Sequence, residues 1–92
     1  MEISVRIPTP LRRLTNGQDK VALTSTNIKN MVDDLEEHFP GMKKRLCDDE
    51  GNLRNFVNVY INGEDVRFLN GIATALKDGD EISLVPAVAG GN

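Results

Sequence analysis

The chain has 92 residues, 39% of them hydrophobic and 27% charged, and a formal net charge of −3. This composition is typical of one small globular domain with a modest core. The basic residues occur in short, separated groups such as Arg12-Arg13 and Lys43-Lys44-Arg45, which argues against nucleic-acid binding. The single cysteine, Cys47, excludes an internal disulfide and a cysteine-only metal site. No apolar run has membrane-spanning length and no signal-peptide pattern is present, so we expect a cytoplasmic protein that contacts no membrane.

The first 24 residues predict a β-hairpin. Residues 2–7 alternate between polar and apolar side chains, which is typical of a half-buried strand. Pro8 and Pro10 end this strand, because proline cannot donate a backbone hydrogen bond to a sheet. A connection over residues 9–14 leads to the turn dipeptide Asn16-Gly17, and a second strand is expected over residues 20–24.

The most regular pattern in the sequence predicts an amphipathic helix. Five apolar residues recur at helical spacing and form one stripe: Ile28, Met31, Val32, Leu35 and Phe39. Ser25 and Thr26 are suitable N-cap residues before this stripe, and Pro40-Gly41 ends the helix. His38 falls in the last turn, where a partial positive charge suits the helix dipole. The opposite face carries acidic residues that we interpret as a solvated surface: Asp33, Asp34, Glu36 and Glu37.

The second half of the chain predicts further strands and two short helical turns. The first helical turn is expected over residues 42–46, in a polar, turn-rich segment. Residues 56–62 form the clearest strand, a short strand follows over residues 65–68, and the second helical turn lies within residues 71–77. The last strand is expected over residues 81–86.

These elements predict an α+β fold in which one main helix packs on one face of a mixed sheet of four to five strands. The first and last strands are expected to pair in parallel at the sheet centre. We place this domain at residues 1–86 and a flexible tail, which contains Gly90-Gly91, at residues 87–92.

The tail contains no charged side chain and none larger than valine before its final asparagine. Two given positions are both glycine by chance in roughly 0.5% of sequences. Five extended residues span about 16–18 Å, so such a tail can enter the active site of another protein and present its terminal carboxylate there. A frayed chain end is the alternative reading of the same residues.

Few other residues suggest chemistry. A catalytic Cys–His pair would have to use the only histidine, His38, and the only cysteine, Cys47. We expect Cys47 to be partly exposed and to have no role in thiol transfer. If Val57, Val59 and Ile61 face the core, an exposed apolar patch is expected on the other face of the sheet, formed by Phe56, Tyr60 and Val85. Such patches mark partner surfaces, although ordinary cross-strand packing would also place these residues there.

Three segments of the sequence resemble the ubiquitin-like β-grasp sulfur carriers of the MoaD/ThiS family. They are FVNVYIN with EDVRF, GIATAL with DGD, and the C-terminal LVPAVAGG. The combination of these segments with a terminal Gly-Gly is specific, and the predicted strand order before residue 56 fits as well. Within the family, the likeness is greatest to the carrier of a cysteine-synthesis branch.

The resemblance implies a protein co-substrate rather than an enzyme. In the family, an E1-like activating enzyme uses ATP to adenylate the carboxylate of the terminal glycine, here Gly91, and a sulfur donor protein then supplies the sulfur of a thiocarboxylate. Val88, Ala89 and Gly90 would thread the tail through a narrow channel. The carrier itself would bind no cofactor and no metal, whereas the acceptor synthase of a cysteine-forming branch would use pyridoxal phosphate.

Asn92 departs from the family pattern, because the outermost carboxylate belongs to asparagine instead of Gly91. The resemblance implies that a peptidase removes Asn92, typically a zinc metallopeptidase of the JAMM type. Alternatively, Asn92 is a residue added by cloning or part of a lineage-specific inactive tail. Two rival functions also stay open: a ubiquitin-like modifier joined through Gly91 to lysines, and an interaction domain with an inert tail. The acceptor pathway is equally open among cysteine or homocysteine, molybdopterin, thiamin and thiolated natural products.

Overall fold

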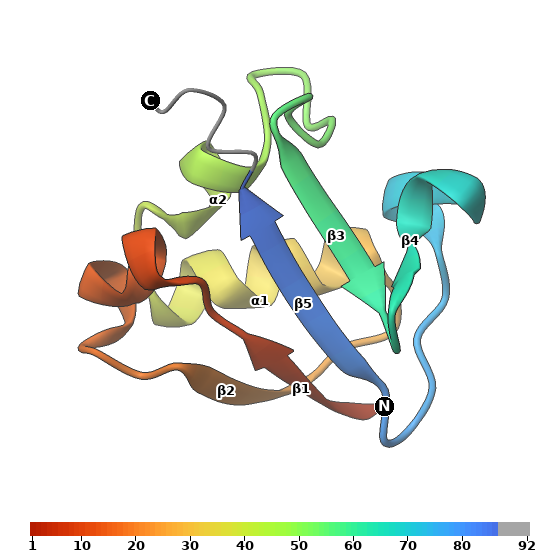
Figure 1. Cartoon of the computed structure of the whole chain (residues 1–92), viewed down its shortest axis with the longest axis horizontal. Coiled ribbons are helices and arrows are strands. Elements are labelled where there is room, and N and C mark those ends of the chain that lie inside the picture. The colour runs from red at the N-terminus through yellow and green to blue at the C-terminus, as the bar shows by residue number, and fades with distance from the viewer. Residues whose placement is uncertain (87–92) are drawn as a thin grey trace.

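The computed structural model describes residues 1–86. Within this range, five strands form one mixed sheet in the order β2-β1-β5-β3-β4 (Figure 1). The strands are β1 (Glu2–Arg6), β2 (Lys20–Thr24), β3 (Val57–Ile61), β4 (Glu64–Asp65) and β5 (Glu81–Pro86). β1 and β5 pair in parallel and the other neighbours are antiparallel. The predicted hairpin and the central parallel pairing of the first and last strands are therefore confirmed.

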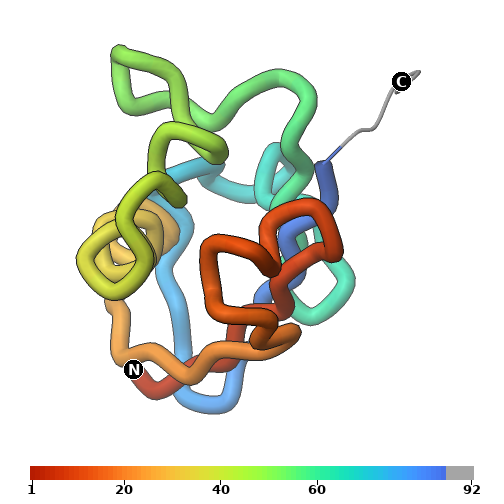
Figure 2. Tube along the Cα trace, turned by 90° about the vertical axis from the view of Figure 1, so that its left-hand side faces the viewer, coloured from red at the N-terminus to blue at the C-terminus, as the bar shows by residue number. Residues whose placement is uncertain are grey.

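The helices lie on one face and at one end of this sheet. The main helix α1 (Ile28–His38) crosses the face, and the short helix α2 (Met42–Leu46) lies near the end of β5 (Figure 1). Seen from the side, α1 and the sheet form two separate layers (Figure 2). This is the expected α+β, β-grasp architecture. Three 3-10 helices complete the described chain: η1 (Thr9–Thr15), η2 (Val66–Phe68) and η3 (Gly71–Ala73).

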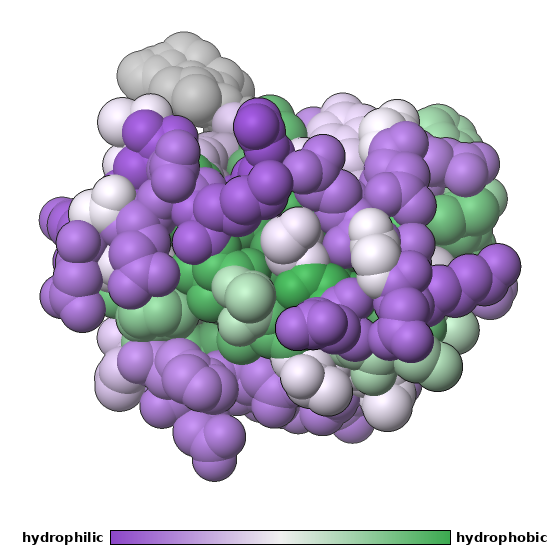
Figure 3. Space-filling view, turned by 90° about the horizontal axis from the view of Figure 1, so that it is seen from below, coloured by the Kyte–Doolittle hydropathy of each residue, from purple (hydrophilic) through white to green (hydrophobic). Residues whose placement is uncertain are grey.

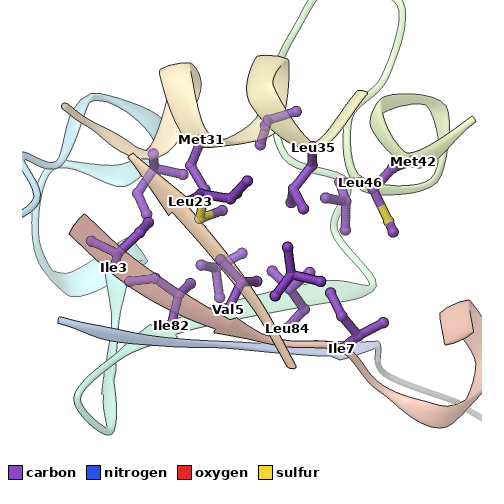
Figure 4. Close-up of a cluster of buried hydrophobic side chains, with 14 of the residues drawn as sticks. Ile3, Val5, Ile7, Leu23, Met31, Leu35, Met42, Leu46, Ile82 and Leu84 are labelled. Carbon is purple, nitrogen blue, oxygen red and sulfur yellow. The ribbon is translucent and has the colours of Figure 1, made fainter. Parts of the chain in front are cut away.

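The core lies between the two layers. Alternate residues of each strand point toward the helices, as the period of two requires. Figure 4 shows Ile3, Val5, Ile82 and Leu84 on the sheet side and Leu35 and Met42 on the helix side, and all six side chains are buried. Burying one such side chain stabilises the fold by roughly 1.5–3 kcal/mol, so this layer of contacts holds the central strand in place.

The start of α1 differs from the sequence-based expectation. Asn27 is the N-cap, and its side chain accepts a hydrogen bond of 2.7 Å from the backbone N–H of Asn30. The predicted N-cap residues have other partners: the hydroxyl of Ser25 donates to Asp34, and the backbone N–H of Thr26 donates to Asn30. Asparagine caps a helix as well as serine does. The backbone of Ser25 is still bonded to the N-terminal end of β1's segment, since its N–H donates to the carbonyl of Met1 at 2.9 Å.

Three shorter elements also differ from their predicted form. The expected connection over residues 9–14 is the 3-10 helix η1, with Pro10 in its first turn. The expected strand over residues 65–68 is the 3-10 helix η2, because the Asp65 side chain accepts from the N–H of Arg67 and turns the chain after β4. The helical turn expected within residues 71–77 is limited to η3. The predicted turn over residues 42–46 is confirmed as α2.

Polar side chains form much of the surface. Figure 3, which views the molecule from below, shows apolar surface near the centre of that face, surrounded by hydrophilic residues. None of the helices within residues 1–86 is long and apolar enough to cross a membrane.

Candidate functional site

The last described residue, Pro86, lies where the chain leaves the central strand of the sheet. β3 pairs with β5 along its whole length, as far as Val57 opposite Pro86. The parallel pairing with β1 covers only the first half of β5, from Glu81 to Ser83. The end of β5 is therefore bound on one side and open on the other.

Pro8 explains why β1 does not pair with the end of β5. The N–H of Ser4 donates to the carbonyl of Asp80 at 3.1 Å, and in a parallel pair this bond repeats every two residues. The repeat would have residue 8 donate to the carbonyl of Leu84, but Pro8 has no N–H. β1 ends at Arg6 for this reason.

Pro86 fits the same geometry. The N–H of Asn62 donates to the carbonyl of Glu81 at 2.8 Å. Because hydrogen-bonded and non-hydrogen-bonded pairs alternate in an antiparallel ladder, Val57 and Pro86 form a non-hydrogen-bonded pair. The donor that proline lacks would have pointed away from β3, toward the open side. Pro86 therefore removes no hydrogen bond between β5 and β3. It also offers no N–H donor to a further strand on the open side.

A groove of about 480 Å³ lies on the open side of β5. Its walls include Val85 and three basic side chains, Arg6, Arg12 and Lys20. Two of these are partly neutralised, since Glu81 lies 3.3 Å from Lys20 and 4.0 Å from Arg6. Arg12 is held through its Nε, which donates to the carbonyl of Ile7 at 3.0 Å.

The three residues of the predicted partner surface lie in two different settings, and only Phe56 and Val85 are near this end of the sheet, because Tyr60 pairs with Ser83 and Asp65. Val57, Val59 and Ile61 are buried, as expected, so Tyr60 and Val85 project from the opposite face, where Tyr60 is half-buried and Val85 is 43% exposed. Phe56 is 50% exposed, but it precedes β3 and borders a second pocket together with Pro86. The guanidinium of Arg54 lies 5.9 Å from its ring centroid.

The reactive residues predicted from the sequence lie outside the described range. These are the threading residues Val88, Ala89 and Gly90, the activated residue Gly91 and the processed residue Asn92. Their roles stay predictions, and the structure bears on them only through the position and surroundings of Pro86.

Cys47 is buried, with 2% of its surface exposed, so the expectation of a partly exposed residue is wrong. It directly follows α2 and belongs to the core cluster. Burial raises the pKa of its thiol, although the nearby positive charge of Lys43 acts in the opposite direction. A buried, protonated thiol is a poor nucleophile, which argues against a thiol-transfer role.

The acidic face of α1 is less freely solvated than expected. Asp33 binds the ammonium of Lys43 at 2.9 Å, and Asp34 accepts from the hydroxyl of Ser25 at 2.6 Å. The carboxylate of Glu36 accepts from the backbone N–H groups of Lys43 and Gly41, and these bonds lower its pKa. Within residues 1–86, no group of three acidic, histidine or cysteine side chains could hold a metal ion. Asp33 and Glu36 therefore connect α1 with α2, whereas Asp34 connects α1 with Ser25 directly after β2.

Sequence reasoning missed a convergence of basic residues near Pro86. Arg12-Arg13 and Lys43-Lys44-Arg45 are about thirty positions apart, and each group alone suggests only a local role. The fold places η1 and α2 on either side of the end of β5, so that Arg13 and Arg45 border one pocket with Pro86. Only knowledge of the topology could have revealed this.

Comparisons with known proteins give a consistent result. The profile of the ThiS family matches residues 5–91. The sulfur carrier protein CysO of Mycobacterium tuberculosis (strain ATCC 25618 / H37Rv) is 46% identical over 93 residues, covering 99% of this chain and 100% of the relative. Small archaeal modifier protein 3 of Haloferax volcanii is 36% identical over 94 residues, with the same coverage.

Similarity extends to solved structures. A chain of the Amycolatopsis orientalis BexX/CysO complex superposes with a TM-score of 0.90 at 42% identity, covering 94% of this chain and 96% of that chain. The similarity to these relatives therefore includes the fold and extends over nearly the whole length of the chain. The chain belongs to the ThiS family, the ubiquitin-like group of the MoaD/ThiS type that its sequence resembles.

Proposed function

We propose that this protein is a sulfur carrier, a co-substrate whose residue Gly91 is adenylated and converted to a thiocarboxylate. The observation that supports this most strongly is the family match, which runs through Gly90 and Gly91 and stops before Asn92. The relative with 46% identity is itself named a sulfur carrier protein. A sulfur carrier is acted on by partner enzymes and needs no catalytic residue of its own.

The proposed reaction has two steps. A carboxylate oxygen of Gly91 attacks the α-phosphorus of ATP in the activating enzyme, and pyrophosphate leaves. A hydrosulfide equivalent from the sulfur donor protein then attacks the acyl carbon and AMP leaves, which produces the thiocarboxylate. A free carboxylate is a poor electrophile, so the acyl-adenylate divides one difficult substitution into two easier ones.

Glycine suits both steps. Gly91 has no Cβ, so its carbonyl is open to attack and its backbone can adopt angles closed to other residues. Gly90, Ala89 and Val88 are small and uncharged, which fits a segment that threads through a narrow channel. Pro86 would give this segment a fixed starting point at the centre of the sheet.

In the proposed pathway a JAMM-type metallopeptidase first removes Asn92, because only then does Gly91 carry the terminal carboxylate. The acceptor of the sulfur is proposed to be a pyridoxal-phosphate-dependent synthase that forms cysteine or a related sulfur amino acid. The identity to CysO over nearly the whole chain supports this choice.

Partners are proposed to bind the sheet face that carries Tyr60 and Val85, with Phe56 at its end. Tyr60→Asp replaces a half-buried aromatic ring on this face by a charge and leaves the core residues on the other face untouched. We expect the complex with the activating enzyme to weaken while the melting temperature changes by only a few degrees. An unchanged affinity would refute the assignment of this face.

The function is tested by mass spectrometry. A chain ending at Gly91 is incubated with the E1-like enzyme of the same organism, ATP and sulfide, and the intact mass is expected to rise by the replacement of one oxygen by sulfur. The full chain ending at Asn92 is the matched control and should stay unchanged. If the Gly91 form also stays unchanged and releases no pyrophosphate from ATP, the proposal is wrong.

A second function is favoured by one specific observation, the 36% identity to a small archaeal modifier protein. A modifier would share the activation of Gly91 but transfer the acyl group to lysine amines of other proteins. Peptide mapping of proteins captured from the native cells separates the two functions. Adducts joined through Gly91 to lysine would favour the modifier, and a terminal thiocarboxylate would favour the carrier.

A further inference from the structure

A pocket of about 240 Å³, here called the exit pocket, lies directly beside the point where the chain leaves the sheet. Four elements build it: η1, α2, the start of β3 and the end of β5. Its floor is formed by the buried side chains of Leu11, Leu46 and Leu84, and its walls include Phe56 and Pro86. The volume and the apolar floor suit one side chain of the size of leucine or phenylalanine.

The rim of the exit pocket is positively charged. Arg13 and Arg45 border it, one from η1 and one from α2, and none of the described residues that line it is acidic. Both arginines are exposed, and neither guanidinium forms a hydrogen bond or ion pair within residues 1–86. Three other basic side chains near this end have partners, since Arg6 and Lys20 pair with Glu81 and Arg12 donates to the carbonyl of Ile7. An apolar floor between two unpaired cations recognises an apolar side chain flanked by carboxylates.

We infer that the exit pocket binds an apolar side chain, flanked by aspartate or glutamate residues, from the enzyme that activates Gly91. Position supports this occupant. Pro86 forms part of the pocket wall, and the enzyme that receives the tail must approach the globule at the point where the tail begins. The inference rests on the proposed function and adds a contact that would fix the orientation of the globule while the tail enters the active site.

The test is the double charge reversal Arg13→Glu/Arg45→Glu in the chain ending at Gly91. Binding to the E1-like enzyme is measured by calorimetry, and pyrophosphate release is measured in parallel. Two lost attractions and two new repulsions are expected to raise the Kd about tenfold. The Kd of the unmodified chain is expected to rise with salt concentration more steeply than that of the variant.

Lys29→Glu/Lys77→Glu is the matched control. It makes the same change in net charge with two exposed lysines remote from β5's end, one in the first turn of α1 and one before β5. Its Kd is expected to change less than about twofold, because charges separated by more than the screening length of about 10 Å interact little. Equal effects of the two double variants would mean that net charge alone matters and would overturn the inference.

Two further outcomes are decisive. Binding that depends on Arg13 and Arg45 without pyrophosphate release would support the docking contact and contradict the proposed function. Amide chemical shifts of Leu11 and Leu46 that change when residues 87–92 are deleted, with no enzyme present, would mean that the chain's own tail fills the pocket. The core lies within residues 1–86, so the shortened chain is expected to fold, and circular dichroism checks this.

Discussion

Replacing Arg67 by methionine would remove the side chain that fixes the start of β3. The guanidinium donates to the side-chain oxygen of Asn58 and to three backbone carbonyls. The carbonyl acceptors are those of Arg54 at 3.1 Å, Asn55 at 3.2 Å and Val57 at 2.7 Å. Methionine keeps the apolar stem and loses all four bonds. Because Val57 pairs with Pro86, the substitution tests how firmly the exit of the chain is held.

The cost follows from the exposure of these groups. A hydrogen bond contributes about 0.5–1.5 kcal/mol net to the free energy of unfolding. Its loss costs least where the freed acceptor can bond to water instead. Arg67 is exposed, and only its bond to the Val57 carbonyl is partly buried. We therefore expect a total loss of about 2 kcal/mol. For a chain of this length, that lowers the melting temperature by about 8–16 °C.

Thermal unfolding followed by circular dichroism measures the loss, and amide hydrogen exchange locates it. Protection of the Val57 amide, which donates to the Arg54 carbonyl at 3.0 Å, is expected to fall more than protection of the β1–β2 hairpin. Arg67→Lys is the matched control: it keeps the charge, but its ammonium reaches fewer of the acceptors, so about half of the loss is expected. A methionine variant that melts within 2 °C of the unmodified chain (about 0.3–0.5 kcal/mol) would refute this account.

Three further predictions concern the helices and the buried thiol. Glu36→Gln should destabilise the protein only at higher pH. Hydrogen bonds from the N–H groups of Lys43 and Gly41 lower the pKa of the Glu36 carboxylate in the folded protein. The stabilisation that they provide is therefore complete above pH 4.5 and is lost as the pH falls through the lowered pKa. Melting curves of both proteins should therefore converge in acid. Cys47 should react with a thiol reagent in the folded protein far more slowly than in urea, and equal rates would contradict its burial. Leu35→Ala should lower the free energy of unfolding by about 2–5 kcal/mol in urea titrations, because Leu35 is fully buried in α1.

The elements that sequence periodicity predicted well are those whose burial is strongest. The stripe from Ile28 to Leu35 and the alternation of Val57, Val59 and Ile61 each require one face to be buried, and no competing pattern exists. The predictions that were wrong concern short elements, which depend on hydrogen bonds between side chains and the backbone. Asn27, Asp65 and the start of η1 were missed because aspartate, asparagine and proline fit several local conformations, and tertiary contacts select one of them.

The candidate site divides in the same way. The sequence predicts a reactive end at Gly90-Gly91, because this pair is a local signal with a chemical reason, and that role stays a prediction. Its surroundings could not be predicted, because the exit pocket combines residues from four segments that are spread along the sequence from Pro10 to Pro86. Local patterns record the chemistry of a single segment. A pocket formed by several segments follows only from the topology.

The position of Pro86 connects the fold to the proposed chemistry. Pro8 cannot continue the bonds of β1, and Pro86 offers no donor on the side that β1 leaves open, so no further strand is expected to extend the sheet beside the end of β5. β3 nevertheless holds β5 as far as Pro86. The chain therefore leaves from the central strand of the sheet, on a side where Pro86 offers no N–H to a further strand. In the proposed function, an enzyme that takes up the tail would recognise side chains at this end, where Arg13 and Arg45 form no ion pair within residues 1–86.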